Sequence, residues 1–184
     1  YTLATYTEAD SYKVTARPLN ITGTNADDKI YDSTTEATIT GTAQLDGLVT
    51  GDAVSIDATA VVGSFEDKNV GNGKQVNVTG YTLAGADSGN YSFTQPSGLS
   101  ADITPRPITV TKIADGQSVY GDPLAPGDVS LDNVIGGDKV TAQVALTGTT
   151  LSTSNNVNAG DYGQEADGTL SGDDAANYTL TNTI

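Results

Sequence analysis

The segment Gly85-Ala86-Asp87-Ser88-Gly89-Asn90-Tyr91 occurs a second time, as Gly172-Asp173-Asp174-Ala175-Ala176-Asn177-Tyr178. Glycine, aspartate, asparagine and tyrosine keep their spacing, and the offset from position 85 to position 172 is 87 residues. A repeat of this length indicates two copies of one structural unit. Three other pairs of segments recur at offsets of 86 to 89 residues: Thr50–Val54 with Gly136–Val140, Asn69-Val70 with Asn156-Val157, and Ala16–Thr22 with Pro105–Thr111.

Within each copy the hydrophobic pattern has a period of two residues. Val76, Val78 and Tyr81 are separated by polar or small residues, and Lys139–Leu146 alternates in the same way. Such alternation predicts strands with one buried and one solvated face. Turn residues such as Asp46-Gly47 recur about every 8 to 12 residues, which is typical of an all-β sandwich or small barrel.

The offset also places domain boundaries. We predict one β-sandwich repeat over residues 17–105 and a second over residues 106–184. Residues 1–16 resemble the last strand region of a preceding repeat. The counterpart of Leu99–Thr104 would fall at positions 186–191, beyond Ile184, so the second repeat is expected to lack its final strand. We therefore predict that residues 1–16 of another molecule can fill this place, giving head-to-tail strand swapping.

The predicted linkers are short and rich in proline. Thr104-Pro105-Arg106-Pro107 and Thr15-Ala16-Arg17-Pro18 stand between repeats. Proline fixes its own φ angle and restricts the residue before it, so these linkers are expected to be extended and stiff. Similar domains joined by stiff linkers form an elongated rod.

Composition excludes several functions. The chain carries 8 Lys and Arg against 23 Asp and Glu, a formal net charge of −15, which disfavours nucleic acid and bare anionic membrane as partners. Cysteine and histidine are absent, which excludes disulfides, thiolate or imidazole metal sites and Ser-His or Cys-His triads. No apolar run is long enough for a membrane-spanning helix. We also expect no catalytic residues, no enzymatic activity and no cofactor.

The repeated segments resemble known families. Residues 17–104 resemble the YDG-type repeat domain of large bacterial adhesins, and residues 106–184 are similar to the related MBG-type domain. The resemblance implies tandem Ig-like antiparallel β-sandwiches with Greek-key topology in filamentous-haemagglutinin-like exoproteins. It also implies an extracellular or cell-surface location and a role in attachment or biofilm formation. The segments that carry it are Ala16–Leu19, Lys29–Thr35, Phe65–Gly71, Val78–Tyr81, Gly85–Tyr91, Ser118–Pro123, Asn156–Tyr162 and Asn177-Tyr178.

One residue departs from the family motif. The Tyr-Asp-Gly of the family reads Tyr31-Asp32-Ser33 here. If the glycine serves a position with positive φ, Ser33 is expected to be slightly strained or the turn to be altered.

The acidic turns are the candidates for a metal site. Asp87 with Asn90, and Asp174 with Asn177, offer oxygen ligands that Ca²⁺ would accept. The alternative, which we favour, is that these side chains bond to nearby backbone and form turns. The loop Asn25–Asp28 is a second acidic cluster with the same two interpretations.

Four tyrosines are interpreted as structural. We expect Tyr91 and Tyr178 each to begin a strand, with a corner-type hydrogen bond from the hydroxyl group to the backbone. Tyr31 and Tyr120 are expected to be strand residues, with the ring in the core and the hydroxyl at its rim.

The function that we predict is that of a structural stalk in a large bacterial surface or secreted adhesin. The repeats would project a distal binding region, and their partners would be neighbouring repeats of the same chain. A host or matrix polysaccharide or protein would be bound through other regions. The alternatives are a repeat that itself binds a glycan, exopolysaccharide or protein ligand, and a stalk made rigid by Ca²⁺.

Overall fold

The computed structural model describes residues 13–182. Within this range the regular structure is β-strand, apart from two single-turn 3-10 helices, η1 (Ser88–Asn90) and η2 (Ala175–Asn177). The all-β prediction is therefore confirmed. In the part of the chain that the structure describes, no helix is long and apolar enough to span a membrane.

The first unit, residues 17–104, contains ten strands in three sheets. One sheet has the order β4-β1-β9, the second has the order β2-β10-β7-β6-β3, and β5 and β8 form a pair. The strands are β1 (Arg17–Ala26), β2 (Lys29–Ile30), β3 (Glu36–Ala37), β4 (Ile39–Asp46), β5 (Ser55–Asp57), β6 (Val62–Phe65), β7 (Gly71–Thr79), β8 (Thr82–Ala84), β9 (Tyr91–Phe93) and β10 (Leu99–Thr104).

The second unit, residues 106–182, repeats part of this topology. Its sheets have the orders β12-β11-β15 and β13-β14. The parallel pairing of β11 with β15 starts at Arg106 and Tyr178, just as the parallel pairing of β1 with β9 starts at Arg17 and Tyr91. The strands are β11 (Arg106–Ile113), β12 (Val129–Asp132), β13 (Thr141–Thr147), β14 (Gly163–Ser171) and β15 (Tyr178–Leu180).

The alternating segments place their apolar side chains as expected. Val76 and Val78 of β7 are buried, as is Tyr81. On β13, Ala142 is buried, while Val144 and Leu146 are half-buried. The first unit thus has the larger core, because only Val110, Ala142 and Ala166 form the separate buried cluster of the second unit.

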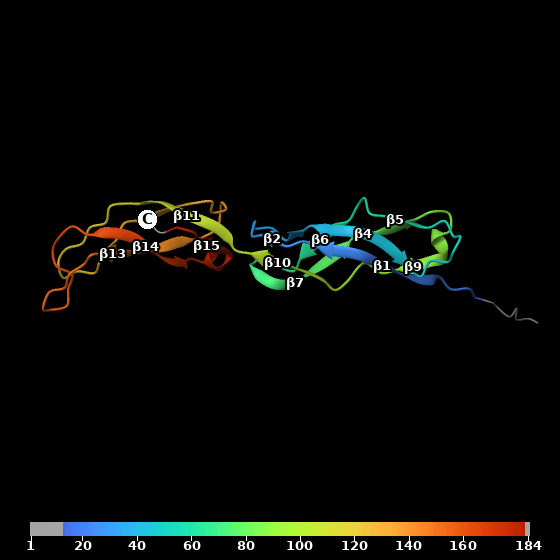
Figure 1. The fold of residues 1–184 in the computed structure, drawn as a ribbon, viewed down its shortest axis with the longest axis horizontal. Helices are drawn as coiled ribbons and strands as arrows, with labels where there is room; N and C mark the ends of the chain where they lie inside the picture. The colour runs from blue at the N-terminus through green and yellow to red at the C-terminus, as the bar shows by residue number, and fades with distance from the viewer. Residues whose placement is uncertain (1–12, 183–184) are drawn as a thin grey trace, which may run out of the picture.

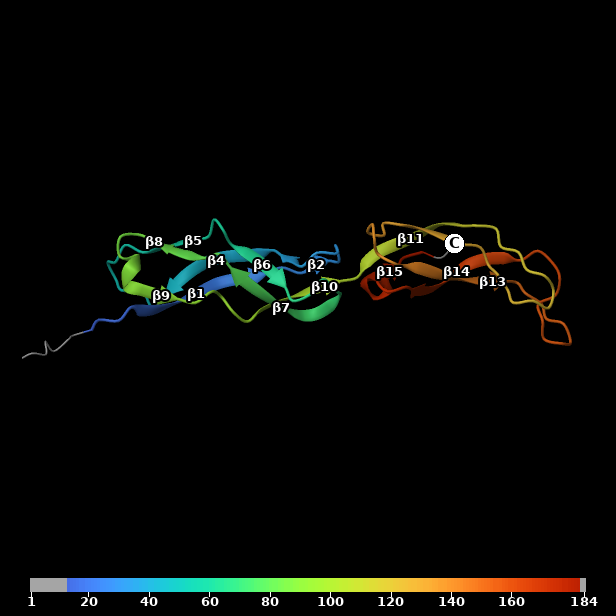
Figure 2. The same ribbon diagram turned by 180° about the vertical axis from the view of Figure 1, so that it is seen from behind.

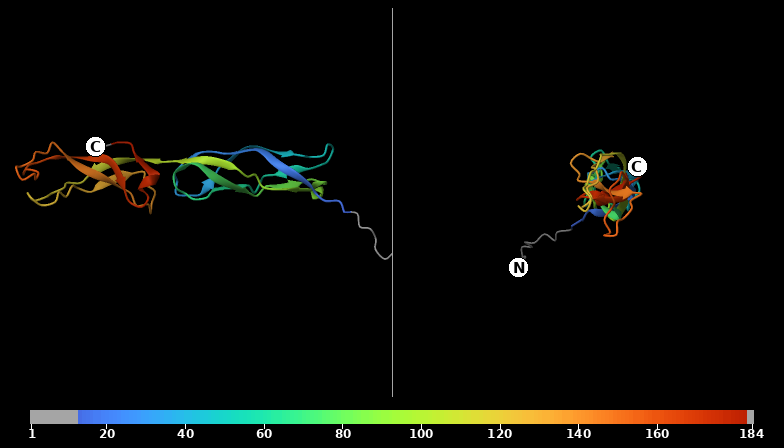
Figure 3. Two further views of the ribbon diagram at one scale, coloured as in Figure 1. Left: turned by 90° about the horizontal axis from the view of Figure 1, so that it is seen from below. Right: turned by 90° about the vertical axis from the view of Figure 1, so that its left-hand side faces the viewer.

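The two units lie end to end along one axis (Figure 1; Figure 2). Strand β10 ends at Thr104 and β11 begins at Arg106, so that only Pro105 separates them, and the linker is extended as predicted. A view along the axis superposes the two units within one narrow outline (Figure 3).

The two units differ at one sheet edge. In the first unit β10 lies between β7 and β2. In the second unit, β14 pairs with β13, and among the described residues no strand lies on the opposite edge. Residues 13–16 form no strand with the rest of the chain, and residues 1–12, which we predict to be a strand of a preceding repeat, lie outside the described range.

Candidate functional site

A group of polar residues connected by hydrogen bonds and ion pairs lies where the two units meet. We call it the joint. It consists of the side chains of Tyr31, Lys68 and Asn69 and the backbone N–H of Val70 in the first unit, and of the side chains of Arg106, Asp138, Asp174, Asn177 and Tyr178 in the second unit.

The linker is fastened on both sides. The N–H of Tyr31, directly after β2, donates to the carbonyl of Thr104 at 2.9 Å. Arg106 donates from Nη1 to the carbonyl of Tyr31 at 3.5 Å, and from Nε and Nη2 to the carbonyl and Oδ1 of Asn133 at 2.9 and 2.7 Å. The guanidinium group therefore contacts both units, because its donors point in fixed directions from one plane.

Asp138 is the centre of the joint. Its Oδ2 accepts a hydrogen bond from the hydroxyl of Tyr31 at 2.9 Å and one from the hydroxyl of Tyr178 at 2.6 Å. The Asp138 side chain is only 6% exposed. The two tyrosine rings pack edge to face, with centroids 5.4 Å apart and an angle of 74° between their planes. One buried carboxylate thus connects a residue from each unit, and such charge-assisted hydrogen bonds are stronger than neutral ones.

The charges in the joint are partly compensated. The Nζ of Lys68 lies 3.8 Å from Oδ1 of Asp138 and 3.9 Å from Oδ1 of Asp174. Burial by itself would raise the pKa of Asp138, but the hydroxyls of Tyr178 and Tyr31 and the charge of Lys68 together lower it below the ordinary value. Burial and the Asp138 carboxylate raise the pKa of Tyr178 to about 12. At neutral pH the carboxylate is therefore ionised and the hydroxyl is protonated, as the hydrogen bond requires.

Asn177 forms a second polar contact between the units. It is 4% exposed. Its Oδ1 accepts the backbone N–H of Val70 at 2.9 Å, and its Nδ2 donates to Oδ1 of Asn69 at 3.3 Å. The residue ends helix η2, which follows Gly172 at φ +114°. A Cβ atom at Gly172 would lie 2.2 Å from the carbonyl oxygen of Lys139, so glycine is required where this loop begins.

An apolar layer accompanies the polar contacts. Ile108 and Tyr178 of the second unit belong to the same cluster of buried side chains as Tyr31, Phe65 and Ile103 of the first. The hydrophobic core therefore continues through the joint. Opening the joint would expose apolar surface to water as well as break hydrogen bonds.

The second-unit half of the joint recurs at the other end of the first unit. There the hydroxyl of Tyr91 donates to Oδ2 of Asp52 and accepts the N–H of Val49 at 3.2 Å. In the joint, the N–H of Ile135 donates to the hydroxyl of Tyr178 at 3.1 Å in the same way. The same geometry therefore occurs in both repeats.

The residues that we considered as Ca²⁺ ligands take other roles. Oδ2 of Asp87 accepts the N–H of Ala53 at 2.8 Å, and Oδ2 of Asp174 accepts the N–H of Lys139 at 3.0 Å. Asn90 ends η1, whereas Asn177 binds Val70 in the joint. Within residues 13–182 no group of three or more acidic side chains lies close enough together to hold a metal ion.

The acidic loop Asn25–Asp28 also bonds to the chain around it. Oδ1 of Asp28 accepts the N–H of Asp102 at 2.7 Å, and Oδ1 of Asp27 accepts the hydroxyl of Thr40 at 2.7 Å. These carboxylates hold the loop against β10 and β4, as the turn interpretation expects.

The tyrosine predictions had mixed outcomes. Tyr91 and Tyr178 each begin a strand, as predicted. The predicted hydrogen bond from hydroxyl to backbone is wrong in its direction, because each hydroxyl donates to a carboxylate and accepts a backbone N–H. Tyr31 is fully buried but lies just after β2, outside a strand. The prediction for Tyr120 is wrong, because its side chain is 53% exposed at the outer end of the second unit.

Asp138 and Lys68 are joint residues that were not predicted from the sequence. A signal was present for the first of them, since Asp52 and Asp138 recur at 86 residues near the recurring Tyr91 and Tyr178. No signal pointed to Lys68, which has no lysine counterpart beside Asn156.

A comparison with family models identifies the first unit. The model of the YDG domain matches residues 15–98, so this part of the chain is a YDG domain. Neither the curated proteins nor the solved structures include a match to the chain.

Proposed function

We propose that the two units are tandem, non-enzymatic stalk repeats of a large bacterial surface or secreted adhesin. Each would be an Ig-like β-sandwich, YDG-type over residues 17–105 and MBG-type over residues 106–184, and its strands would be mainly but not wholly antiparallel, because β1 with β9 and β11 with β15 are parallel pairs. In the extracellular space they would hold a distal binding region away from the cell. The observation that carries this proposal is the joint, where one buried carboxylate accepts hydrogen bonds from both units.

Such a joint would hold the two units in a fixed relative orientation. If the units bent apart, Asp138 would lose the Tyr31 donor and Val70 would lose the acceptor on Asn177. A hydrogen bond to a charged group contributes about 1.5–3 kcal/mol, and a buried donor left without a partner costs about 1–3 kcal/mol. A flexible tether needs none of these contacts, whereas a spacer that transmits direction requires them.

The charge of the chain agrees with this role. A net charge of −15 keeps long arrays of repeats in solution and repels other acidic surfaces. We propose that the partners of each repeat are the neighbouring repeats of the same chain. We propose no binding of nucleic acid and no insertion into a membrane.

Rigidity is tested by the distance between two spin labels, one on each unit. The chain contains no cysteine, so Thr42→Cys and Thr169→Cys introduce unique label sites at exposed positions. Double electron–electron resonance should give one narrow distance distribution. Asp138→Ala should broaden it, because the joint loses its central acceptor.

The matched control is Asp52→Ala, which removes the recurring carboxylate at the end of the first unit that lies away from the joint. This variant should leave the distribution narrow. A distribution that is already broad in the unchanged chain, or one that Asp52→Ala broadens equally, would contradict the proposal of a stiff spacer.

A further inference from the structure

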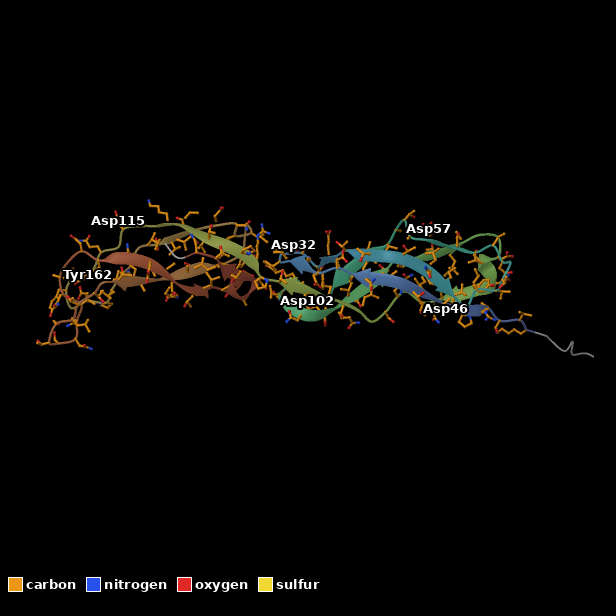
Figure 4. All side chains as sticks on the ribbon, viewed as in Figure 1. Asp32, Asp46, Asp57, Asp102, Asp115 and Tyr162 are labelled. Carbon is orange, nitrogen blue, oxygen red and sulfur yellow. The ribbon has the colours of Figure 1, made fainter. Side chains whose placement is uncertain are left out.

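The chain enters and leaves the first unit at opposite ends. Strand β1 begins at Arg17, close to Asp46, which pairs with Asn20. Figure 4 shows Asp46 at the end of the first unit that lies away from the joint, and Asp102 of β10 at the end that meets the second unit. A pull on the chain on both sides of this unit therefore draws β1 and β10 in opposite directions along the strands (Figure 1).

A short parallel contact connects the two segments that such a pull would separate. Strand β2 follows β1 after two residues and pairs in parallel with the last two residues of β10. The pairs are Lys29 with Ile103 and Ile30 with Thr104. We call this contact the clamp. Its two strands run in the same direction and would be pulled in opposite directions, so the hydrogen bonds between them are loaded together rather than one after another.

Two further hydrogen bonds extend the clamp on either side of β2. Oδ1 of Asp28, just before β2, accepts the N–H of Asp102 at 2.7 Å. The N–H of Tyr31, just after β2, donates to the carbonyl of Thr104 at 2.9 Å. Tyr31 and Ile103 are both 0% exposed, so their side chains shield this end of the clamp from water that would compete for its hydrogen bonds.

Strand β2 has only two residues, but the side chain of Lys29 fastens it to the rest of the sheet. Its Nζ donates to the carbonyl oxygens of Thr34 and Glu36, both at 2.9 Å, and lies 5.5 Å from the centre of the Phe65 ring. Glu36 belongs to β3, at the edge of the sheet opposite β2, and Phe65 belongs to β6 beside it. A slide of β2 along β10 would therefore break these contacts as well.

Strand β1 would be loaded in the same way as the clamp. Six of its residues, from Asn20 to Ala26, pair with β4, and its first three, from Arg17 to Leu19, pair in parallel with β9. Because β1 is hydrogen-bonded on both sides, a pull on Arg17 along the strand strains all of these pairs together.

We propose that the first unit is a load-bearing module, in which the clamp resists forces that stretch the chain. This role goes beyond that of a stiff spacer, because a joint can fix an orientation without load and still belong to a unit that unfolds under a weak pull. The clamp lies beside the joint, since Tyr31 belongs to both, and a load carried by β10 passes through Pro105 alone into β11. Spin-label distances test the stiffness of the joint without load, so the two proposals can fail separately.

Single-molecule pulling with optical tweezers tests the effect of direction. Because the chain contains no cysteine, Ala16→Cys with Lys112→Cys places the handles at exposed positions on either side of the first unit, and the clamp is sheared. Asn77→Cys with Ser100→Cys places both handles at one end of the β7–β10 pair, which then opens one residue at a time. The first unit should unfold at a clearly higher force in the first arrangement. Equal forces in the two arrangements would overturn the proposal.

Two substitutions separate resistance to load from stability without load. Asp28→Ala removes the acceptor of the Asp102 N–H in the clamp, whereas the control Asp87→Ala removes the acceptor of the Ala53 N–H, at 2.8 Å, outside the clamp. Urea titrations show that each variant remains folded and how far its free energy of unfolding falls. Forced unfolding is governed by the unfolding rate, so Asp28→Ala should unfold about tenfold faster than the unchanged chain when both are pulled from positions 16 and 112 at the same force.

The control should unfold under load at nearly the rate of the unchanged chain, because the contact of Asp87 is still intact when the clamp breaks. An unchanged rate for Asp28→Ala, or an equal acceleration by Asp87→Ala, would show that the load does not pass through the clamp and would refute the role given to it.

Discussion

Tyr178 contacts Asp138 and Ile135 through its hydroxyl group and Tyr31 through its ring. The hydroxyl donates to Asp138, accepts the N–H of Ile135, and belongs to a ring that packs against Tyr31. Its pKa of about 12 lies above the value of 10.0 that describes an ordinary tyrosine. A group with a raised pKa in the folded state contributes stability that is complete below the unfolded pKa and is lost as the pH rises through the folded pKa. The free energy of unfolding should therefore fall between about pH 10 and about pH 12.

Tyr178→Phe tests this assignment. The variant leaves the N–H of Ile135 and the carboxylate of Asp138 each without one partner, so the free energy of unfolding at pH 7 should decrease by about 1–3 kcal/mol. Urea titrations across the alkaline range should show a smaller loss of stability between pH 10 and pH 12 than in the unchanged chain. Tyr120→Phe is the control, because that hydroxyl lies 3.3 Å from an exposed serine and outside the joint. An unaltered alkaline profile for Tyr178→Phe would refute the role given to this hydroxyl.

Ser33 has a backbone conformation that glycine adopts more easily than any other residue. Its φ angle is +67°, in the left-handed region, which is unfavourable for a residue with a Cβ atom. The sequence-based expectation of strain at Ser33 thus agrees with the structure. Ser33→Gly should raise the free energy of unfolding by about 0.5 kcal/mol, since relief of the strain exceeds the added entropy of the unfolded chain.

Chemical denaturation measures the effect of Ser33→Gly, and Ser33→Ala is the control because alanine keeps the Cβ atom. The alanine variant should be no more stable than the unchanged chain. Equal stabilisation by both substitutions would mean that the Ser33 side chain, and not its φ angle, opposes folding.

A strand could be predicted from the sequence where its own residues show an alternating pattern of apolar and polar side chains. The alternation around Val76 and Val78 located β7, because apolar side chains two residues apart lie on one face. Strands β2 and β3 have two residues each and exist only because β10 and β6 lie beside them. No local pattern can reveal such elements, since their hydrogen bonds are made to segments far away in the sequence.

The joint could be predicted only in part for a related reason. Asn177 was recognised as part of a repeated turn, and helix η2 confirms the turn. Its contact with Val70 depends on how two folded units meet, at a separation of 107 residues. In the sequence, Asp138 follows two glycines and has the pattern of a turn residue. It is a buried hydrogen-bond acceptor because Tyr31 and Tyr178 approach it from different units.

The two units together form a one-dimensional array. Each unit has its own sheets, but one cluster of buried side chains contains residues of both. In such arrays stability is approximately the sum of the unit stabilities and the energies of their interfaces. A joint of several kcal/mol makes neighbouring units unfold together, whereas a weak joint lets each unfold at its own temperature.

Asn177→Ala should separate the unfolding of the two units. The substitution leaves the N–H of Val70 without its acceptor and should weaken the joint by about 1–3 kcal/mol. Differential scanning calorimetry should show one transition for the unchanged chain and two for the variant. The matched control is Asn90→Ala, which changes the counterpart residue at the end of η1, where Asn90 is exposed. Because that position is not in the joint, the control should keep a single transition. If both variants unfold in one transition, the coupling does not depend on Asn177, and the apolar layer around Ile108 and Tyr178 must suffice to join the units.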